Sequence, residues 1–148
     1  MNVRIRFFYR WMHSAHGHPP ILREARNIND LPFGESHPFY VLSGALSDFL
    51  ENRHGDLDEA MHAVEKVDDG ALDSFETGGE GFTHHITRSR VRFEHSVFGE
   101  CPEWPIWCCT LAQYKAALEG YRRFLDMPKS LDSELIIELP DGVPVNCQ

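Results

Sequence analysis

Residues 110–125 read TLAQYKAALEGYRRFL, and this stretch predicts an amphipathic helix around which the rest of the chain folds. Thr110 precedes the apolar repeat and Gln113 follows three residues later. This is the capping-box spacing, in which each side chain binds a backbone amide that the first helical turn leaves without a partner. The apolar residues of one face recur at intervals of three and four: Leu111, Tyr114, Leu118, Tyr121 and Leu125. Gly120 costs about 1 kcal/mol against alanine in a helix, so we expect a close approach to a sheet there.

Two runs before this helix alternate between apolar and polar residues, as strands with one buried face do. We expect a hairpin with strands over 82–86 and 91–98, followed by a short strand over 104–109. In the second run His95 falls on the apolar face, which indicates a hydrogen-bonded core histidine. Residues 88–89 are Arg-Ser and lack the Asn or Gly that a tight two-residue turn favours, so we expect a bulge or a longer loop.

The two ends of the chain each predict a strand, and the two strands carry opposite charges. Residues 3–10 alternate apolar side chains with arginines, and residues 134–139 include two outward glutamates. Because opposite charges on neighbouring strands attract, by roughly 0.2–1 kcal/mol for each cross-strand pair, we expect these strands to lie near each other. An arginine row would also suit nucleic acid. The protein is anionic overall and would repel phosphate, so we interpret the row as a solvated strand face and expect no direct nucleic-acid partner.

Hydrophobic periodicity also assigns the rest of the chain to helices, connectors and a tail. We expect helices over 39–51 and 56–67, connectors over 12–38 and 71–80, and a loosely held tail over 140–148. All 148 residues, of which 42 % are apolar, are expected to form a single domain. The predicted fold class is α+β, with a mostly antiparallel sheet of about five strands and two or three helices packed on one face.

The sequence gives no sign of membrane insertion or export. It contains no run of about 18 apolar residues that could span a bilayer. Its first residues lack the cleavable apolar core of a signal peptide. We therefore expect a cytoplasmic protein without a membrane partner.

The cysteines form no C-x-x-C pair; they are Cys101, Cys108, Cys109 and Cys147. The adjacent Cys108 and Cys109 could hardly bridge each other without strain, so we expect all of them to be reduced. A nucleophilic cysteine would need a histidine close by and a lowered pKa. Cys108 or Cys109 with His84 or His85 on a neighbouring strand could meet that requirement, although vicinal cysteines on a strand usually serve packing.

Metal binding has one candidate cluster, His13, His16 and His18, within the proline-rich connector. Zinc sites need ligands held on fixed elements and a fourth partner, and a Gly-Pro loop offers neither. The sequence also lacks the G-x-x-x-x-G-K, G-x-S-x-G and H-E-x-x-H motifs. We therefore expect no metal, no cofactor and no catalytic residues.

Negative charge is concentrated in one third of the chain. Residues 48–80 contain eleven acids and two bases, a net charge of −9 that equals the net charge of the whole protein. Asp56 and Glu59 also give a capping pattern for the second predicted helix. Such acids can serve solubility alone, but a concentrated negative surface can also attract a basic partner. The candidate partner-binding residues are Asp56, Asp58, Glu59, Glu65, Asp68, Asp69, Asp73 and Glu76.

A family resemblance points to the same kind of partner. A strand-like hairpin, a W-x-x-W turn at Trp104 and Trp107, and the pattern L-x-x-Y-x-x-A-L-x-x-Y-R-x-F-L over 111–125 follow acidic amphipathic helices. This order resembles small bacterial immunity proteins that neutralise contact-dependent growth-inhibition toxins, over roughly residues 80–126. The resemblance implies a non-enzymatic inhibitor of a cognate toxin domain, often a basic nuclease. Two alternatives stay open, namely a small enzyme or metal-binding protein that uses the His and Cys residues, and a non-enzymatic regulatory adaptor.

Overall fold

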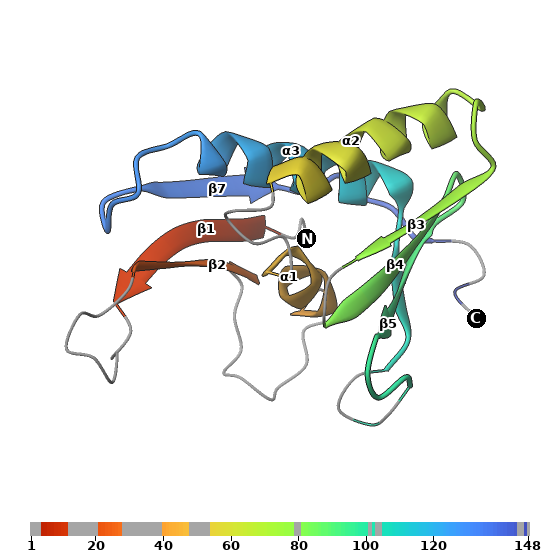
Figure 1. Cartoon of the computed structure of the whole chain (residues 1–148), viewed down its shortest axis with the longest axis horizontal. Helices are drawn as coiled ribbons and strands as arrows, with labels where there is room; N and C mark the ends of the chain where they lie inside the picture. Colours follow the sequence, from red (N-terminus) through yellow and green to blue (C-terminus); the bar gives the residue numbers. More distant parts are fainter. Residues whose placement is uncertain are drawn as a thin grey trace.

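The computed structural model describes residues 4–11, 21–27, 40–47, 54–78, 81–100, 102, 105–144 and 147. In chain order these residues form β1 (Arg4–Trp11), β2 (Ile21–Asn27), α1 (Tyr40–Ser47), α2 (His54–Asp68), β3 (Ser74–Gly78), β4 (Phe82–Thr87), β5 (Val91–His95), β6 (Trp107–Cys109), α3 (Leu111–Leu125) and β7 (Glu134–Glu138) (Figure 1). The fold is α+β with antiparallel strand pairing, as the sequence predicts. Within the described part, no helix is both long and apolar enough to cross a bilayer.

The strands form two sheets, so the prediction of a single sheet of about five strands is wrong. One sheet has the order β2-β1-β7 and the other has the order β3-β4-β5-β6. The two unexpected strands lie in segments that the sequence predicts to be connectors, since β2 falls in the proline-rich stretch and β3 in the polar stretch. Both strands are held by pairing with a neighbour, and such pairing can override a weak local pattern.

The strands at the two ends of the chain are neighbours, which confirms the expectation from their charges. β1 pairs with β7 in antiparallel register, with Arg4 opposite Glu138 and Phe8 opposite Glu134. The guanidinium of Arg6 lies 2.6 Å from the Glu134 carboxylate. Both side chains are more than 40 % exposed, so this ion pair contributes modestly to stability.

Helix α3 packs on the sheet formed by the chain ends. Its N-terminus has the predicted capping box, in which Thr110 Oγ1 accepts from Gln113 N at 3.1 Å and Gln113 Oε1 accepts from Thr110 N at 2.9 Å. Gly120 is the point of close approach, because a Cβ there would lie 2.6 Å from Ile137 Cδ1 on β7. The ring of Phe7 on β1 stacks on the ring of Tyr121 with 5.4 Å between centroids.

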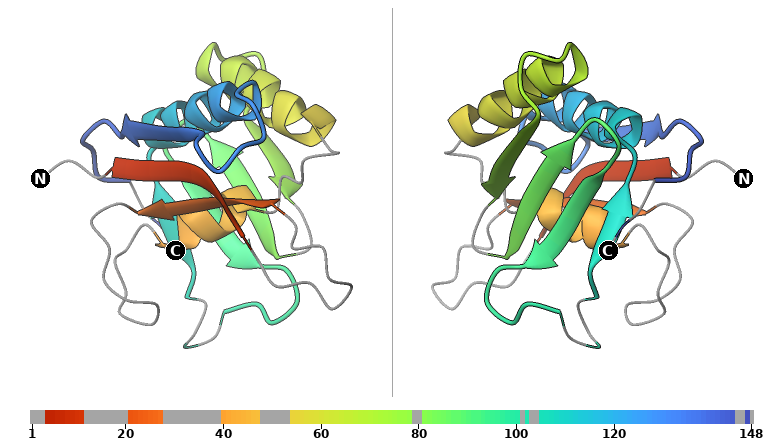
Figure 2. Two further views of the ribbon diagram at one scale, coloured as in Figure 1. Left: turned by 90° about the vertical axis from the view of Figure 1, so that its left-hand side faces the viewer. Right: turned by 90° about the vertical axis from the view of Figure 1, so that its right-hand side faces the viewer.

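The helices occupy different places relative to the two sheets. α2 and α3 lie next to each other across the top of the molecule in Figure 1, and the turned views of Figure 2 agree. α1 contacts β2 of one sheet and both β4 and β5 of the other, so it sits between them. A single apolar core joins both sheets and all these helices. Among the described residues, no helix covers the outer face of the β3-β4-β5-β6 sheet (Figure 2, right).

Several local boundaries differ from the prediction. α2 begins at His54, so Asp56 lies inside the helix rather than at its N-cap. The β4–β5 hairpin closes with a tight turn, because Thr87 N donates to Arg90 O at 2.9 Å and Thr87 Oγ1 donates to the same oxygen at 3.0 Å. The threonine hydroxyl thus supports a turn that has no Asn or Gly.

Candidate partner-binding surface

Helix α2 carries most of the predicted partner-binding acids on its exposed side. We use the name α2 acidic surface for the five acids that are exposed on or directly after this helix: Asp58, Glu59, Glu65, Asp68 and Asp69. Asp58, Glu65 and Asp69 are spaced by seven and four residues, which places them along one line of the helix. The opposite side of α2 is buried in the core, so the local fold directs these carboxylates toward solvent.

Few of these carboxylates are neutralised by neighbouring bases. Asp58 Oδ1 lies 3.5 Å from Arg122 Nε on α3, with the carboxylate side chain 54 % exposed. An exposed pair of this kind contributes little to stability. Within the described residues, Glu59 and Glu65 form no ion pair. The α2 acidic surface therefore keeps its negative charge in the folded protein.

The C-terminal end of α2 places negative charge where the helix itself is negative. Asp68 is the last helical residue, and Asp69 follows it with its backbone N–H still bonded to Glu65 O at 3.0 Å. The carbonyl end of a helix carries a partial negative charge, so acids there are unfavourable. Arg88 of the β4–β5 turn offsets part of this negative charge, because its Nη2 donates to Asp68 O at 3.0 Å. Asp69 Oδ1 accepts from Ala71 N at 2.8 Å.

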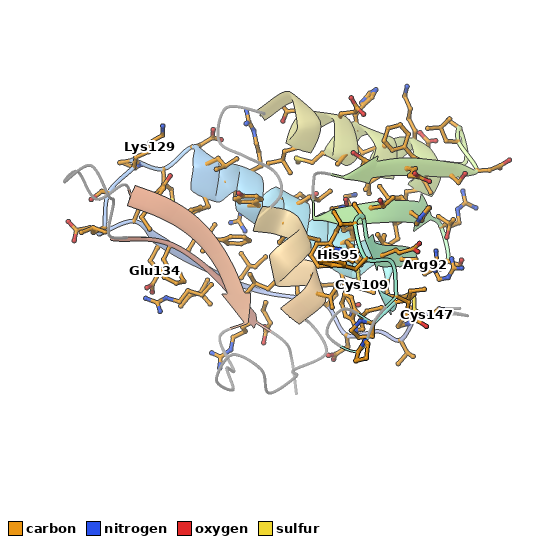
Figure 3. The ribbon with its side chains drawn as sticks, turned by 60° about the horizontal axis from the view of Figure 1, so that its bottom comes forward. Arg92, His95, Cys109, Lys129, Glu134 and Cys147 are labelled. Atoms are coloured by element: carbon orange, nitrogen blue, oxygen red, sulfur yellow. A yellow bond between two sulfur atoms is a disulfide. The ribbon has the colours of Figure 1, made fainter. Side chains whose placement is uncertain are left out.

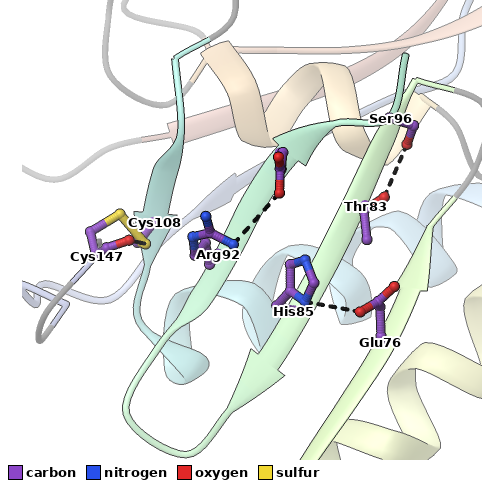
Figure 4. Close-up of polar contacts among 8 residues, drawn as sticks. Glu76, Thr83, His85, Arg92, Ser96, Cys108 and Cys147 are labelled. Carbon is purple, nitrogen blue, oxygen red and sulfur yellow. Dashed lines mark hydrogen bonds and ion pairs between the residues drawn. A yellow bond between two sulfur atoms is a disulfide. The ribbon is translucent and has the colours of Figure 1, made fainter. Parts of the chain in front are cut away.

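The α2 acidic surface does not include the other three predicted site residues. Asp56 lies on α2, but its side chain is outside the described residues. Asp73 is exposed in the segment that leads into β3. Glu76 lies on β3 and points to the outer side of its sheet, where a carboxylate oxygen is 3.1 Å from His85 Nδ1 (Figure 4). The structure therefore does not bring Glu76 together with the helix acids, because strand alternation directs it away from the helices.

A polar row crosses the outer face of the four-stranded sheet, and sequence reasoning missed it. Strand register places Glu76 opposite His85, His85 opposite Arg92 and Arg92 opposite Cys108. The guanidinium Nη1 of Arg92, which Figure 4 labels, also lies 3.7 Å from Glu94 Oε2. Acids and bases are matched along this row, so it has little excess charge to offer a partner. Only the strand register, which the sequence does not state, could have revealed it.

The buried histidine is His84 rather than His95. His84 is fully buried, and its Nδ1 is 2.8 Å from the Tyr114 hydroxyl. Burial, with a smaller contribution from the charge of His85, lowers the pKa of His84 from 6.5 to about 3, so this imidazole is neutral. His95 is half-buried at the end of β5, where its Nδ1 accepts from Val97 N at 3.3 Å and Phe98 N at 3.2 Å. β5 therefore ends at His95, and the predicted continuation to residue 98 is a turn.

The expectation of reduced cysteines is wrong for two of them. Cys108 of β6 and Cys147 form a disulfide, which joins the sheet to the tail across 39 residues (Figure 4). Figure 3 labels Cys147 and the neighbouring Cys109, which is not part of this bond. The tail is also held by Gln113 Nε2, which donates to Pro140 O at 3.1 Å and to Gly142 O at 3.2 Å. The prediction of a loosely held tail is therefore wrong for this part of it. Cys101 lies outside the described residues.

The described residues offer no support for the alternative of a cysteine nucleophile. Cys108 has no thiol because it is in the disulfide, and Cys109 is fully buried. Burial raises the pKa of the Cys109 thiol far above its usual range, whereas a nucleophile needs a thiolate. The proposed partner His84 is buried against Tyr114.

The candidate metal ligands His13, His16 and His18 lie outside the described residues. Within the part of the chain that the structure describes, no group of three or more His, Cys, Asp or Glu side chains is placed to hold a metal ion.

Comparison with protein-family models, with curated proteins and with solved structures finds no match to this chain. The exposed carboxylates of α2 are the described groups best placed to bind a cationic partner.

Proposed function

We propose that this protein is an immunity protein that binds a basic bacterial toxin domain through the α2 acidic surface and neutralises it without any catalysis of its own. The observation that carries the proposal is the placement of the acids. Five of them lie exposed on or directly after one helix, two of them at its carbonyl end, where negative charge is unfavourable. The hydrogen bond from Ala71 N accounts for the position of Asp69 alone, whereas binding to a cationic partner accounts for the group.

A nuclease toxin is the partner whose chemistry fits this surface best. A nuclease must carry positive charge in the cleft that holds the phosphate backbone. A negative surface of matching size raises the rate of association with such a cleft and disfavours partners of the wrong charge. Once bound, the protein would occlude the cleft and exclude the nucleic acid.

The proposed location is the cytoplasm, where a nuclease meets its substrate. Disulfides there are open to reduction by cellular thiols. The disulfide joins β6 to the tail and includes no residue of α2. We therefore expect toxin affinity to be the same in the presence and absence of a thiol reductant.

The test is a triple charge reversal, Glu59→Lys, Glu65→Lys and Asp69→Lys. Binding to a basic nuclease domain encoded beside this chain's gene should weaken roughly tenfold or more at low salt, because attraction becomes repulsion. Inhibition of nuclease activity and protection of cells that produce the toxin should fall in parallel. Titration calorimetry measures the loss of binding, and a nuclease assay measures the loss of inhibition.

A matched control separates the location of the charges from their number. Glu100→Lys, Asp132→Lys and Asp141→Lys change the net charge by the same amount at exposed positions outside α2 and β3. This control should keep most of its affinity. Equal loss in both triple variants would show that net charge alone attracts the partner, and undiminished affinity in the α2 variant would refute the surface. A cognate partner without nuclease activity would favour the regulatory adaptor instead.

A further inference from the structure

The two sulfurs of the Cys108–Cys147 disulfide have different surroundings. Cys108 belongs to β6 and is only 4 % exposed, whereas Cys147 belongs to the tail and is half-buried. A thiol from solution therefore reaches the sulfur of Cys147 more readily than the sulfur of Cys108. When a thiolate attacks Cys147, the sulfur of Cys108 is the leaving group.

Arg92 is the cross-strand neighbour of this leaving sulfur. Strand register places Arg92 of β5 opposite Cys108, and the two side chains lie on the same face of the sheet (Figure 4). The Cβ atoms of such a pair are about 5 Å apart, so the long arginine side chain can reach a sulfur on Cys108. Positive charge beside a cysteine favours the thiolate over the thiol. β5 thus places a cation where negative charge develops as the disulfide opens.

The contacts of Arg92 leave a donor available for that sulfur. Within the described residues, Arg92 Nε is buried and has no hydrogen-bond acceptor. Glu94 Oε2 lies 3.7 Å from Arg92 Nη1, which is too far for a hydrogen bond. A buried N–H without an acceptor is unfavourable, and an uncharged sulfur accepts only weakly. A thiolate on Cys108 would be a charged acceptor for this guanidinium.

We propose that Cys108 and Cys147 form a thiol-exchange site, in which a small thiol adds to Cys147 and Arg92 stabilises the departing Cys108 thiolate. In the first step, a thiolate RS⁻ forms an S–S bond with Cys147. The bond between Cys147 and Cys108 breaks, and its electron pair stays on Cys108. A second RS⁻ then attacks the R sulfur of this mixed disulfide and releases RSSR and the Cys147 thiolate. Two thiols are thereby oxidised, the protein disulfide is reduced, and protons exchange with water.

The exchange controls how the tail is fastened. Opening releases the tail at Cys147, while Gln113 keeps its hydrogen bonds to Pro140 and Gly142. The same steps in reverse close the bond when RSSR is in excess. Cytosolic disulfides are usually transient and respond to the thiol pool, so this site suits the proposed location. The inference does not depend on binding to a toxin.

The test measures how fast a defined thiol opens the disulfide in the full-length protein. Oxidised protein is mixed with mercaptoethanol or with reduced glutathione at neutral pH, and free thiols are trapped with N-ethylmaleimide. Mass spectrometry of the trapped samples gives the opening rate and locates the transient mixed disulfide. We expect the added thiol on Cys147, and an added thiol on Cys108 instead would overturn the proposal.

Variants assign the opening rate to the charge of Arg92. Arg92→Gln should slow opening roughly three- to tenfold, because the departing thiolate loses its cation, and Arg92→Lys should restore most of the rate. Lys129→Gln is the matched control, since it removes the same charge at an exposed position far from Cys147 (Figure 3), and it should leave the rate unchanged. An Arg92→Gln variant that opens as fast as the wild type, or faster, would overturn the proposal.

The two thiols separate stabilisation of the leaving sulfur from attraction of the attacking one. The mercaptoethanol thiolate carries one negative charge, whereas glutathione carries additional carboxylates. If Arg92 acts on the Cys108 sulfur, its loss slows both reactions by the same factor. A loss of rate with glutathione alone would show that Arg92 attracts the attacking thiol, and this result would also overturn the proposal.

Discussion

Helices α2 and α3 are neighbours of equal length, but their charges are arranged in opposite ways. Each has 15 residues and buries one face in the shared core. α3 has a complete capping box at its start and Arg122 and Arg123 in its last turn, where positive charge is favourable. α2 ends with Asp68 and continues with Asp69, where negative charge is unfavourable.

This difference separates charges that serve the fold from charges that need another explanation. The positive charge at the end of α3 follows from helix stability, and Gly120 follows from the close packing of this helix on the sheet. The line of carboxylates on α2 gains little from neighbouring bases, since the ion pair of Asp58 with Arg122 lies at the surface. We therefore expect that α3 holds the fold together and that α2 presents a surface.

The disulfide should give the largest effect, because it fastens the tail near the start of α3. Cys147→Ser should lower the free energy of unfolding by about 2–4 kcal/mol, since the bond closes a long loop. Urea denaturation under non-reducing conditions measures the loss. A thiol reductant should bring the wild type to the stability of the variant, and a wild type that is indifferent to reductant would argue against the bond.

The His84–Tyr114 contact should make the anchoring of α3 sensitive to acid. The folded pKa of His84, about 3, is below its unfolded value of 6.5, so the proton binds the unfolded chain more tightly. The stabilisation is therefore complete above pH 6.5 and is lost as the pH falls toward 3. The free energy of unfolding should drop by about 1.4 kcal/mol per pH unit below 6.5, or about 2 kcal/mol by pH 5.

Denaturation curves between pH 7 and pH 5 measure this slope. His84→Leu should flatten it, while His85→Gln should leave most of it, because burial lowers the pKa of His84 more than the charge of His85 does. A slope that persists in His84→Leu would assign the acid sensitivity to other groups.

The contact of α3 with β7 should tolerate no added side chain. Gly120→Val should destabilise the protein by about 1–3 kcal/mol, because its Cβ would lie 2.6 Å from Ile137 Cδ1. The matched control is Ala112→Val at an exposed position of the same helix, which should cost less than about 0.7 kcal/mol through helix propensity. Equal losses in the two variants would mean that the close approach is not real.

The sequence predicts those parts of the fold whose signals are local. The Thr110 capping box, the small residue at Gly120 and the opposite charges of β1 and β7 can each be read from a few residues, and the structure contains them. β2 and β3 are missed because their stability comes from pairing with a neighbour rather than from their own pattern. The disulfide is missed because its two cysteines meet only in the folded chain.

For the candidate site, too, the sequence predicts only what lies on a single helix. Helical periodicity alone places Asp58 and Glu65 on one exposed line of the helix predicted over 56–67, whereas Asp68 and Asp69 lie beyond its predicted end. It does not show that Glu76 belongs to a strand and points to the other side of a sheet. The closeness of Glu65 and Glu119 also depends on tertiary structure, because these residues are 54 positions apart in the sequence and meet only where α2 packs on α3.

The most direct test of the claim that α2 presents its acids for binding is the free energy of unfolding of Asp68→Asn/Asp69→Asn at low ionic strength. Asn at position 69 keeps the oxygen that accepts from Ala71 N. The account predicts a more stable protein, by about 0.3–1 kcal/mol for each substitution, because negative charge leaves the carbonyl end of the helix. The gain should shrink in high salt. A less stable double variant would contradict the account, because these acids would then serve the fold.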